Sequence, residues 1–322
     1  MSQGKKIVQP SFLQAGDKVA LVSPAYWIPQ EAIQAAADTI RKWGLEPVIG
    51  PHTNNMNVNA YAGTADERAA DLLWALNDDS IKAIVCTRGG YGSIHLLQRI
   101  DAESYASHPK WLIGHGDITF LLHSTVSAGV MGIHGPMAFQ IVDRQDLSTN
   151  IARDILFGTI PQYEVHSHRN NRCGHAEGIL IGGNLSSISA IAGTPYFIPP
   201  TKDVILFFED EEESLHNIDR LFYRLRLLSN FPQIKGIIFG MFNSIKFDME
   251  FNSVEDMLTA HLADSNIPIC CGFPVGSNSS IPMMEGAQCS LDVTPEKAVL
   301  TFLAEGERKL YNLAEVSQQL FR

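Results

Sequence analysis

The sequence predicts an α/β protein with two domains, an N-terminal domain built on a parallel sheet and a C-terminal domain of mixed α/β structure. Three observations lead to this prediction. The first half of the chain alternates strand-like and helix-like segments, with glycine turns after strands, which is the pattern of βαβ units. The second half has several short β-rich runs but only two convincing helices. The length of 322 residues is about twice that of a typical domain.

Hydrophobic periodicity and end signals define the elements of the N-terminal part. The segment 18–23 is a short apolar run that ends at a proline, and the segment 30–43 has apolar residues at helical spacing until a glycine stops it. A second helix is expected over 66–77, where Thr64 and Glu67 resemble a capping box. The other expected strands are 46–49, 81–86 and 111–113, and the other expected helices are 93–99 and 118–124.

Two glycine turns follow neighbouring strands of this part. The turn 88–92 (RGGYG) comes after the strand 81–86, and the turn 114–117 (GHGD) comes after the strand 111–113. In parallel α/β sheets, ligands bind beyond the carboxyl ends of the strands. Both turns are therefore expected to border one ligand-binding crevice.

The C-terminal part begins after a polar segment, 161–176, that is rich in histidine and asparagine and has no clean period. We expect this segment to be a linker between domains over 1–160 and 177–322. The expected C-terminal strands are 176–181, 204–208, 235–240, 267–271 and 299–303, and the expected helices are 218–228 and 254–262.

Composition limits the classes of partner. A hydrophobic fraction of 45% and a charged fraction of 18% are ordinary for a globular enzyme. The net charge of -11 argues against nucleic acid, because nothing supplies the positive footprint that phosphate binding needs. No apolar stretch reaches the length of a membrane span, and the start MSQGKKIVQPSF lacks the apolar core of a signal peptide. We therefore expect a cytoplasmic protein without a membrane partner.

Cofactor and metal motifs are weak in this chain. A G-x-G-x-x-G pattern starting in the turn 88–92 would need its third glycine at His95, and neither a phosphate-binding G-x-x-x-x-G-K-[ST] nor a G-x-S-x-G elbow occurs. The set His166, His168, Cys173 and His175 has none of the common zinc spacings. We expect no cofactor, no metal and, with five cysteines in an odd set, no disulfide framework.

An acidic run, 209–213 (EDEEE), follows directly on an apolar strand. Most of it is expected to be a solvated loop. Glu209 differs because it stands at the strand end, where partial burial fixes a side chain and shifts its pKa, as a catalytic carboxylate requires.

The order of motifs resembles that of the serine LD-carboxypeptidases of peptidoglycan recycling and their microcin-immunity relatives, from about Gly16 to Ala304. The shared motifs include RGGYG at 88–92, HGP at 134–136, GGNL at 182–185 with GTP at 193–195, and Glu-Asp at 209–210 with IDR at 218–220. The resemblance implies a flavodoxin-like N-terminal domain that carries a catalytic serine and a C-terminal domain that carries a glutamate and a histidine. It also implies a homodimer and release of D-alanine from murein tetrapeptide.

The family triad is incomplete here. The family serine lies in G-[Y/F]-S-D-[IV]-T, and the matching position in GHGDIT is Gly116. The family histidine lies in G-F-P-x-G-H, and the matching position in GFPVGSNSS is Ser277. Glu209 is retained as the carboxylate. Glycine offers no nucleophile and serine is no base near neutral pH, so we expect the family reaction to be impaired.

The resemblance also implies a ligand-binding cleft that does not depend on the replaced side chains. Backbone N–H groups near Gly89, Gly90 and Asp117 need no side chain to hold a carbonyl or carboxylate. Arg88, Tyr91 and His115 are further candidate ligand contacts, although Arg88 and Tyr91 equally suit bracing of the loop and His115 suits a hydrogen-bonded loop residue.

Three functions remain open at this stage. The first is a protein that binds a muropeptide-like small ligand with little or no hydrolysis. The second is an active hydrolase of altered chemistry that uses Glu209, Ser277 and His115, although a serine in GSNSS also suits simple turn formation. The third is a regulatory or scaffolding homologue that does not use the pocket.

Overall fold

The computed structural model describes residues 7–57, 59–141, 146–197, 204–229, 231, 234–277 and 280–313. The chain forms two compact units. The first comprises Met1–Thr159 together with Ile281–Gly286, and the second comprises Ile160–Ser280 together with Ala287–Arg322. The protein is thus a mixed α/β structure with two sheets, as the sequence predicted.

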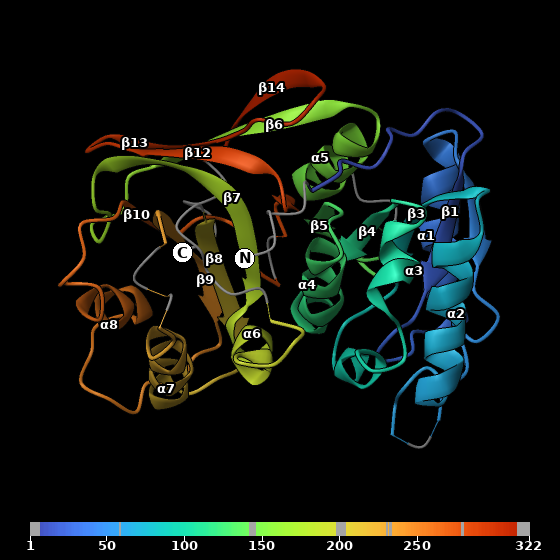
Figure 1. The fold of residues 1–322 in the computed structure, drawn as a ribbon, viewed down its shortest axis with the longest axis horizontal. Coiled ribbons are helices and arrows are strands. Elements are labelled where there is room, and N and C mark those ends of the chain that lie inside the picture. The colour runs from blue at the N-terminus through green and yellow to red at the C-terminus, as the bar shows by residue number, and fades with distance from the viewer. Residues whose placement is uncertain are drawn as a thin grey trace. The chain divides into compact units, whose positions relative to one another are not determined.

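The first unit contains a six-stranded sheet in the order β11-β5-β4-β3-β1-β2 (Figure 1). Its strands are β1 (Lys18–Val22), β2 (Glu46–Ile49), β3 (Ile81–Cys86), β4 (Trp111–Gly114), β5 (Gly132–His134) and β11 (Met283–Glu285). The first five run parallel in the order 2-1-3-4-5, which is the flavodoxin-like order. The edge strand β11 pairs antiparallel with β5.

The α-helices of the first unit are α1 (Gln30–Lys42), α2 (Ala65–Asn77), α3 (Ala102–Ala106), α4 (Thr119–Ser127) and α5 (Leu147–Leu156). Helices α1, α2 and α4 begin within one residue of their predicted starts, whereas α3 and α5 were not predicted. Thr64 and Glu67 form the reciprocal capping box at the start of α2. The segment expected as a helix over 93–99 contains only a short 3₁₀ helix, Ser93–Leu96, whose N-cap Gly92 has a φ of +125°.

One hydrophobic core of this unit lies between the sheet and helices α2, α3 and α4. Buried residues of β1, β3 and β4 meet the apolar faces of these helices. The core includes Val22, Leu72, Ile84, Leu112, Tyr105, Ile118 and Leu121. Burial of a side chain of this size contributes about 1.5–3 kcal/mol, so the strand ends that carry the glycine turns rest on a rigid base.

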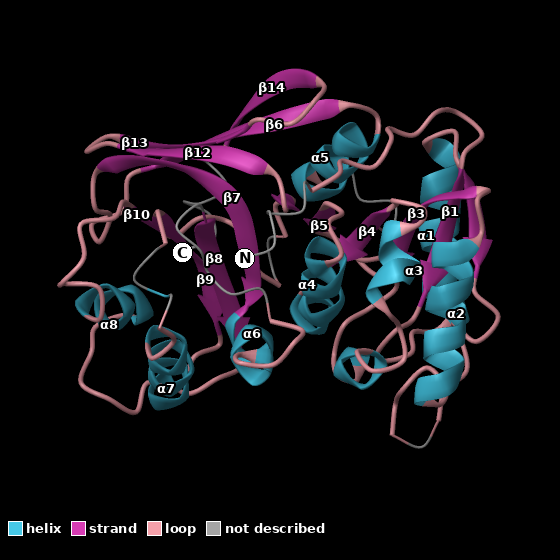
Figure 2. Cartoon of the chain, in the orientation of Figure 1, coloured by secondary structure: helices cyan, strands magenta, loops and turns pink. Residues whose placement is uncertain are grey.

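The second unit contains an eight-stranded sheet in the order β10-β9-β8-β7-β12-β13-β6-β14 (Figure 2). Its strands are β6 (Thr159–His166), β7 (Gly174–Asn184), β8 (Val204–Glu211), β9 (Gly236–Asn243), β10 (Ile269–Cys271), β12 (Gln288–Val293), β13 (Lys297–Phe302) and β14 (Glu307–Asn312). Strands β7 to β10 are parallel, whereas β7, β12, β13 and β6 pair antiparallel.

Helices α6 (Leu185–Ile191), α7 (Leu215–Arg226) and α8 (Val254–Ala260) pack on the parallel half of this sheet. Three phenylalanines form the centre of the core, with ring centroids of Phe208 and Phe222 5.9 Å apart and those of Phe222 and Phe239 5.7 Å apart. Strand β8 lies between β7 and β9, so its carboxyl end is held on both sides.

The segment 161–176, which was expected to be a linker, contains most of β6 and the start of β7. Only alternate positions of β6 are apolar and buried, such as Tyr163 and Val165, so the strand looks polar in the sequence. The domain boundaries also differ from the expected ones, because Ile281–Gly286 returns to the first unit as β11. Among the described residues, no helix is long and apolar enough to cross a membrane.

Candidate functional site

The turn 88–92 requires glycine for steric reasons. Gly90 and Gly92 have φ values of +92° and +125°, a region that favours glycine. A Cβ atom on Gly90 would lie only 2.4 Å from Cδ2 of Tyr26. The buried guanidinium of Arg68, which reaches in from α2, donates to the carbonyl of Pro24 at 2.6 Å and to that of Gly92 at 2.8 Å. The turn is therefore held in one conformation.

The turn after β4 lies directly against this glycine turn. A Cβ atom on Gly89 would be 3.3 Å from the carbonyl oxygen of His115 and 3.4 Å from the backbone nitrogen of Asp117. Gly116 has φ +60°, and a Cβ atom built on it would meet no atom within 4 Å. The position that the resemblance assigns to the family serine is thus a left-handed glycine with open space where a side chain would project.

The carboxylate of Asp117 has a structural role in this turn. One of its oxygens accepts a hydrogen bond from the backbone nitrogen of Ser93 at 2.8 Å, while the Ser93 hydroxyl donates to the Asp117 carbonyl at 2.5 Å. Burial raises the pKa of Asp117, and the Ser93 hydrogen bonds oppose this shift. The side chain therefore ties the turn after β4 to the turn 88–92.

His115 is buried, with an exposed fraction of only 3%. Its Nε2 lies 2.9 Å from Oε1 of Gln140, an oxygen that also accepts the backbone N–H of Met137 at 3.0 Å. Nε2 is therefore the protonated nitrogen, and Nδ1 is buried without a partner in the described part of the chain. Burial lowers the pKa of His115 to about 4, against a smaller opposing effect of Gln140, so the ring is neutral at pH 7.

Behind His115 lie two more buried titratable groups. The ring centroids of His115 and His134 are 5.9 Å apart, and Nδ1 of His134 is 3.9 Å from Oε1 of Glu285 on β11. Burial, followed by repulsion from His115, holds the pKa of His134 well below its usual range. This cluster fixes the inner side of the turn 114–117.

Glu209 at the carboxyl end of β8 is fully buried, with an exposed fraction of 0%. Neither carboxylate oxygen has a partner at hydrogen-bonding distance among the described residues, although the Asn184 side chain is close enough to favour the ionised form slightly. Burial raises the pKa of Glu209 well above its usual range, and repulsion from Asp210 and Glu211 adds to the shift. The sequence had indicated partial burial, and the central position of β8 makes it complete.

The neighbouring carboxylate, Asp210, is satisfied by local donors. It accepts hydrogen bonds from Nδ2 of Asn184 at 2.8 Å and from the backbone nitrogen and hydroxyl of Ser186 at 2.9 and 2.6 Å. Asp210 thereby attaches the start of α6 to β8. Asp210 therefore has a structural role, whereas Glu209 is buried and has no committed hydrogen-bond donor.

Ser277 lies close to Glu209 in the second unit. A Cβ atom on its neighbour Gly276 would be 3.0 Å from Cβ of Met241 and 3.6 Å from Cβ of Glu209. Ser277 itself is half-buried. The two sequence positions that the resemblance assigns to the family carboxylate and histidine are therefore near each other, although they lie 68 positions apart in the sequence. Gly116 belongs to the first unit, and Glu209 and Ser277 belong to the second.

Arg88 and Tyr91 project from the turn 88–92. The guanidinium of Arg88 is 5.9 Å from the ring centroid of Tyr26. Tyr91 has an exposed fraction of 49%, and its ring centroid is 5.5 Å from that of His95. Both side chains thus contact neighbouring aromatic rings and remain on the surface.

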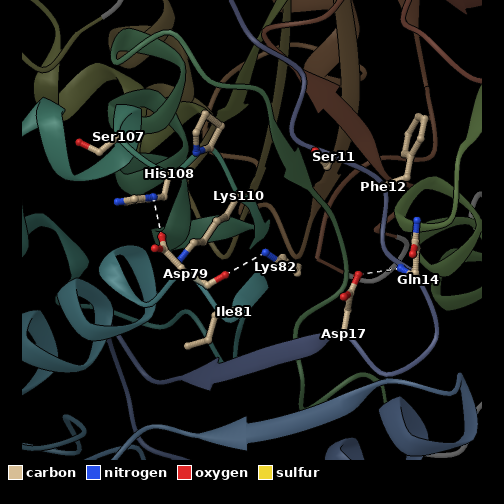
Figure 3. A pocket seen from close by; sticks show the side chains of 11 residues that line it. Ser11, Phe12, Gln14, Asp17, Asp79, Ile81, Lys82, Ser107, His108 and Lys110 are labelled. Carbon is tan, nitrogen blue, oxygen red and sulfur yellow. Dashed lines mark hydrogen bonds and ion pairs between the residues drawn. The ribbon is translucent and has the colours of Figure 1, made fainter.

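A cavity of about 500 Å³ lies at the amino ends of β1, β3 and β4, opposite the strand ends that carry the glycine turns (Figure 3). No motif of the sequence analysis indicated this cavity. Nζ of Lys110 donates to the carbonyls of Ala75 and Asp78 at the end of α2, and burial lowers the pKa of Lys110 to about 8. Both acidic and basic side chains line the cavity, including Asp17, Asp79 and Lys82. It is separate from the glycine turns, which follow the carboxyl ends of the strands.

A serine, a histidine and an aspartate also meet at the start of α7, but their geometry does not suit catalysis. Nδ1 of His216 is hydrogen-bonded to Asp248. The Ser214 hydroxyl oxygen is 3.2 Å from Nδ1 and 3.4 Å from Nε2 of the same ring. An oxygen nearly equidistant from both nitrogens cannot lie along the in-plane lone pair of Nε2, which a general base needs.

Two of the three histidines considered as zinc ligands have other partners. Nδ1 of His175 is 2.6 Å from Oδ1 of Asp292, and Nδ1 of His168 is 3.2 Å from the backbone nitrogen of Asn170. Within the described ranges, no group of three His, Cys, Asp or Glu side chains is arranged to hold a metal ion.

Comparison with known proteins identifies the family. Residues 19–135 match the model of the LD-carboxypeptidase N-terminal domain, and residues 177–291 match that of the LD-carboxypeptidase C-terminal domain. A Bacillus subtilis protein named "Probable murein peptide carboxypeptidase" is 31% identical over 302 residues, which cover 91% of this chain and 94% of the relative. The murein tetrapeptide carboxypeptidase of Pseudomonas aeruginosa is 28% identical over 270 residues, which cover 80% and 87% of the two chains.

Solved structures of similar proteins share the fold. The muramoyltetrapeptide carboxypeptidase from Oxalobacter formigenes superposes with a TM-score of 0.80 at 24% identity and covers 90% of this chain and 99% of its own. The microcin C7 self-immunity protein MccF, solved in complex with glutamyl sulfamoyl guanosine, gives a TM-score of 0.80 at 22% identity and covers 91% and 98% of the two chains. With both domain models matched in order along one chain, the protein belongs to the LD-carboxypeptidase family.

Proposed function

We propose that this LD-carboxypeptidase-family protein binds a muropeptide-like peptide and does not hydrolyse it by the serine route of the family. The observation that carries the proposal is the state of the three triad positions. Gly116 offers open space and no nucleophile, Ser277 replaces the base, and Glu209 remains buried without committed hydrogen-bond donors. A serine triad needs a base beside the nucleophile and a carboxylate behind the base.

The expected loss of rate is large. In well-studied triads, removal of the catalytic side chains leaves a rate acceleration of only about 10³ to 10⁴ over the reaction in water, which comes from the oxyanion hole and substrate binding. Two of the three side chains are replaced here, so the residual rate should lie at that level or below. Binding does not depend on those side chains, because the packed turns at Gly89 and Asp117 present backbone groups.

The ligand class is inferred from the family. The relatives at 31% and 28% identity are named for murein peptides, and the structural neighbour MccF is solved with small aminoacyl-type ligands. Both kinds of ligand present a peptide-like carbonyl. The glycine turns suit such a group because glycine allows close approach of the backbone.

A second candidate function is hydrolysis by altered chemistry. The observation that favours it is Nδ1 of His115, an unprotonated nitrogen one residue from the open space at Gly116. Against it stands the burial of the ring, which keeps Nδ1 away from solvent. This candidate requires turnover that falls when His115 is replaced by phenylalanine.

Calorimetric titration with L-Ala-γ-D-Glu-mesoDAP-D-Ala, together with measurement of D-alanine release, tests the proposal. We expect measurable affinity and no release at an enzyme-like rate. Release at such a rate that depends on Glu209, measured against Glu209→Gln, would overturn the non-hydrolytic function. Absence of affinity would instead favour a scaffolding homologue.

The cytoplasmic location and the homodimer stay predictions. The homodimer is supported only by the resemblance to the family. Sedimentation equilibrium of the purified chain tests it directly, because a mass twice that of the chain is expected.

A further inference from the structure

Three tyrosines and a histidine form a continuous aromatic cluster beside the turn 88–92. The ring centroids of Tyr26 and Tyr61 are 5.7 Å apart, those of Tyr61 and Tyr91 are 6.2 Å apart, and those of Tyr91 and His95 are 5.5 Å apart. Tyr61 also contacts His95, at 5.9 Å. We call these four rings the aromatic wall.

The aromatic wall is held from behind. The guanidinium of Arg68 lies 4.9 Å from the ring centroid of Tyr61, and the same group donates to the carbonyls of Pro24 and Gly92. Tyr26 and Tyr61 are also joined by an isolated antiparallel bridge. Because these contacts hold the Tyr61 ring and the backbone at Pro24 and Gly92, less conformational entropy is lost when a ligand packs beside them.

The exposed part of the aromatic wall is Tyr91. This residue stands between Gly90 and Gly92, whose positive φ values direct the backbone so that the ring projects from the turn. Its exposed fraction of 49% is unusual for a ring that already contacts two others. Tyr26, Tyr61 and His95 are half-buried. The turn that carries Tyr91 packs against the turn with Gly116 through Gly89.

The geometry points to a sugar ring as the occupant: we propose that the aromatic wall binds the saccharide part of a muropeptide. This inference rests on the proposed function and extends it to the substrate class. Aromatic faces carry negative charge density, and the C–H groups of a pyranose present a weakly positive surface to them. Tyrosine hydroxyls and the Arg88 guanidinium beside Tyr26 supply polar partners for sugar hydroxyls and for a carboxylate on the ligand.

The tilt of the rings favours a sugar over a flat base. The interplanar angles are 58° for Tyr26 and Tyr61, 40° for Tyr61 and Tyr91, and 87° for Tyr91 and His95. A planar nucleobase gains most from one flat platform. Tilted rings instead present separate faces, and a single ring face such as that of Tyr91 is enough to pack against the C–H groups of a pyranose.

Three probes separate the sugar contribution from the peptide contribution: the free tetrapeptide, the N-acetylglucosaminyl-N-acetylmuramyl tetrapeptide, and the free disaccharide. Titration calorimetry measures the affinity of each. We expect the disaccharide to improve affinity over the free tetrapeptide by roughly fivefold to tenfold, the size of one aromatic contact. Tyr91→Ala should remove this improvement, and Tyr91→Phe should retain most of it.

Tyr223 on α7 provides a matched control. Its exposed fraction is 46%, and its ring lies edge-on to His261 at 5.5 Å, nearly the environment of Tyr91 beside His95. Tyr223→Ala should leave the affinity of all three probes unchanged. Equal loss in Tyr91→Ala and Tyr223→Ala would mean that the effect is not local to the aromatic wall.

The possible outcomes distinguish this inference from the proposed function. Equal affinity for the two tetrapeptide probes, or an improvement that survives Tyr91→Ala, overturns the sugar site and leaves peptide binding intact. Tyr91-dependent binding of the free disaccharide without binding of the tetrapeptide supports the sugar site and removes the proposed function. Absence of binding by all three probes overturns both. Tyr91-dependent binding of adenosine without binding of the disaccharide assigns the rings to a base instead.

Discussion

Gly276 lies against Glu209, since a Cβ atom on Gly276 would be only 3.6 Å from Cβ of Glu209. This contact puts Ser277 next to a buried carboxylate that has no committed donor. A histidine at this position would supply such a donor, and a serine side chain is too short to reproduce an imidazole. Burial of Glu209 without a committed hydrogen-bond donor therefore lowers the stability of the fold.

Replacement of Glu209 by glutamine should stabilise the protein at neutral pH. Burial raises the folded-state pKa of Glu209 above 4.5, so the stability that it contributes is present below about pH 4.5 and is lost as the pH rises through the folded-state pKa. Glu209→Gln removes this loss, and we expect a gain of about 1 kcal/mol in the free energy of unfolding at neutral pH but none at low pH. Chemical denaturation at several pH values measures it.

The exposed neighbour Glu211 provides a second test of this prediction. Glu211→Gln should weaken the pH dependence, because repulsion from Glu211 contributes to the raised pKa of Glu209. A gain in Glu209→Gln that is the same at low and neutral pH would show that the carboxylate is not held protonated.

His115 should make the fold sensitive to acid. Its pKa falls from 6.5 to about 4 on burial, so the unfolded state takes up a proton that the native ring excludes. The stability is fully present above about pH 6.5 and is lost as the pH falls toward 4. His115→Phe keeps a buried ring and removes the titratable group. The variant should therefore lose less stability between about pH 6.5 and pH 4 than the wild type, by at most about 3 kcal/mol in the free energy of unfolding.

The conformation of the turn 88–92 should be sensitive to one methyl group at Gly90. Gly90→Ala combines a positive φ with a clash against Tyr26, whereas Gly16→Ala meets a similar φ of +89° with no atom within 4 Å. We expect the positive φ to destabilise both variants by about 1–2 kcal/mol. The clash with Tyr26 should destabilise Gly90→Ala by about 1–3 kcal/mol more. Thermal unfolding compares the two, and equal losses would mean that the Tyr26 ring moves aside freely.

Local signals predicted the first unit well. The turn 88–92 follows an apolar strand and contains three glycines, so its position at a strand end could be read from neighbouring residues. The capping box at Thr64 was equally local. Such features depend on short-range steric and hydrogen-bonding preferences, which a single sequence records.

Non-local pairing escaped prediction. Strand β11 contributes three residues to the first sheet through pairing of Met283 with His134, and nothing near residue 283 indicates that partner. The polar strand β6 was expected to be a linker for the same reason, because the neighbouring strands β13 and β14 that make it part of a sheet lie far away in the sequence. The contact between Gly276 and Glu209 is also long-range, and resemblance to the family indicated it rather than any local pattern.

The role of Asp117 shows a further limit. Sequence reasoning considered only its backbone N–H group, and no pattern indicated that its carboxylate accepts a hydrogen bond from the backbone of Ser93. Hydrogen bonds between two turns depend on how the turns pack, and the spacing of residues does not reveal them. The backbone nitrogen of Asp117 remains the relevant group for a ligand, as it lies beside Gly89.

Gly116 offers a controlled way to return a side chain to the site. Gly116→Ser and Gly116→Ala share the cost of a positive φ, about 1–2 kcal/mol, and neither Cβ would clash with the surroundings. The two variants should therefore unfold at the same temperature, measured by circular dichroism. A much lower temperature for both would mean that the open space at Gly116 is needed for the conformation of the turn.

The most direct test of the account is D-alanine release by the double variant Gly116→Ser with Ser277→His, measured on the tetrapeptide beside the wild type and the double variant Gly116→Ala with Ser277→His. If only the nucleophile and the base are missing, the serine-containing variant should release D-alanine at least about 10²-fold faster than the other two proteins. Enzyme-like release by the wild type, or no gain in a folded serine-containing variant that still binds the tetrapeptide, would contradict the account.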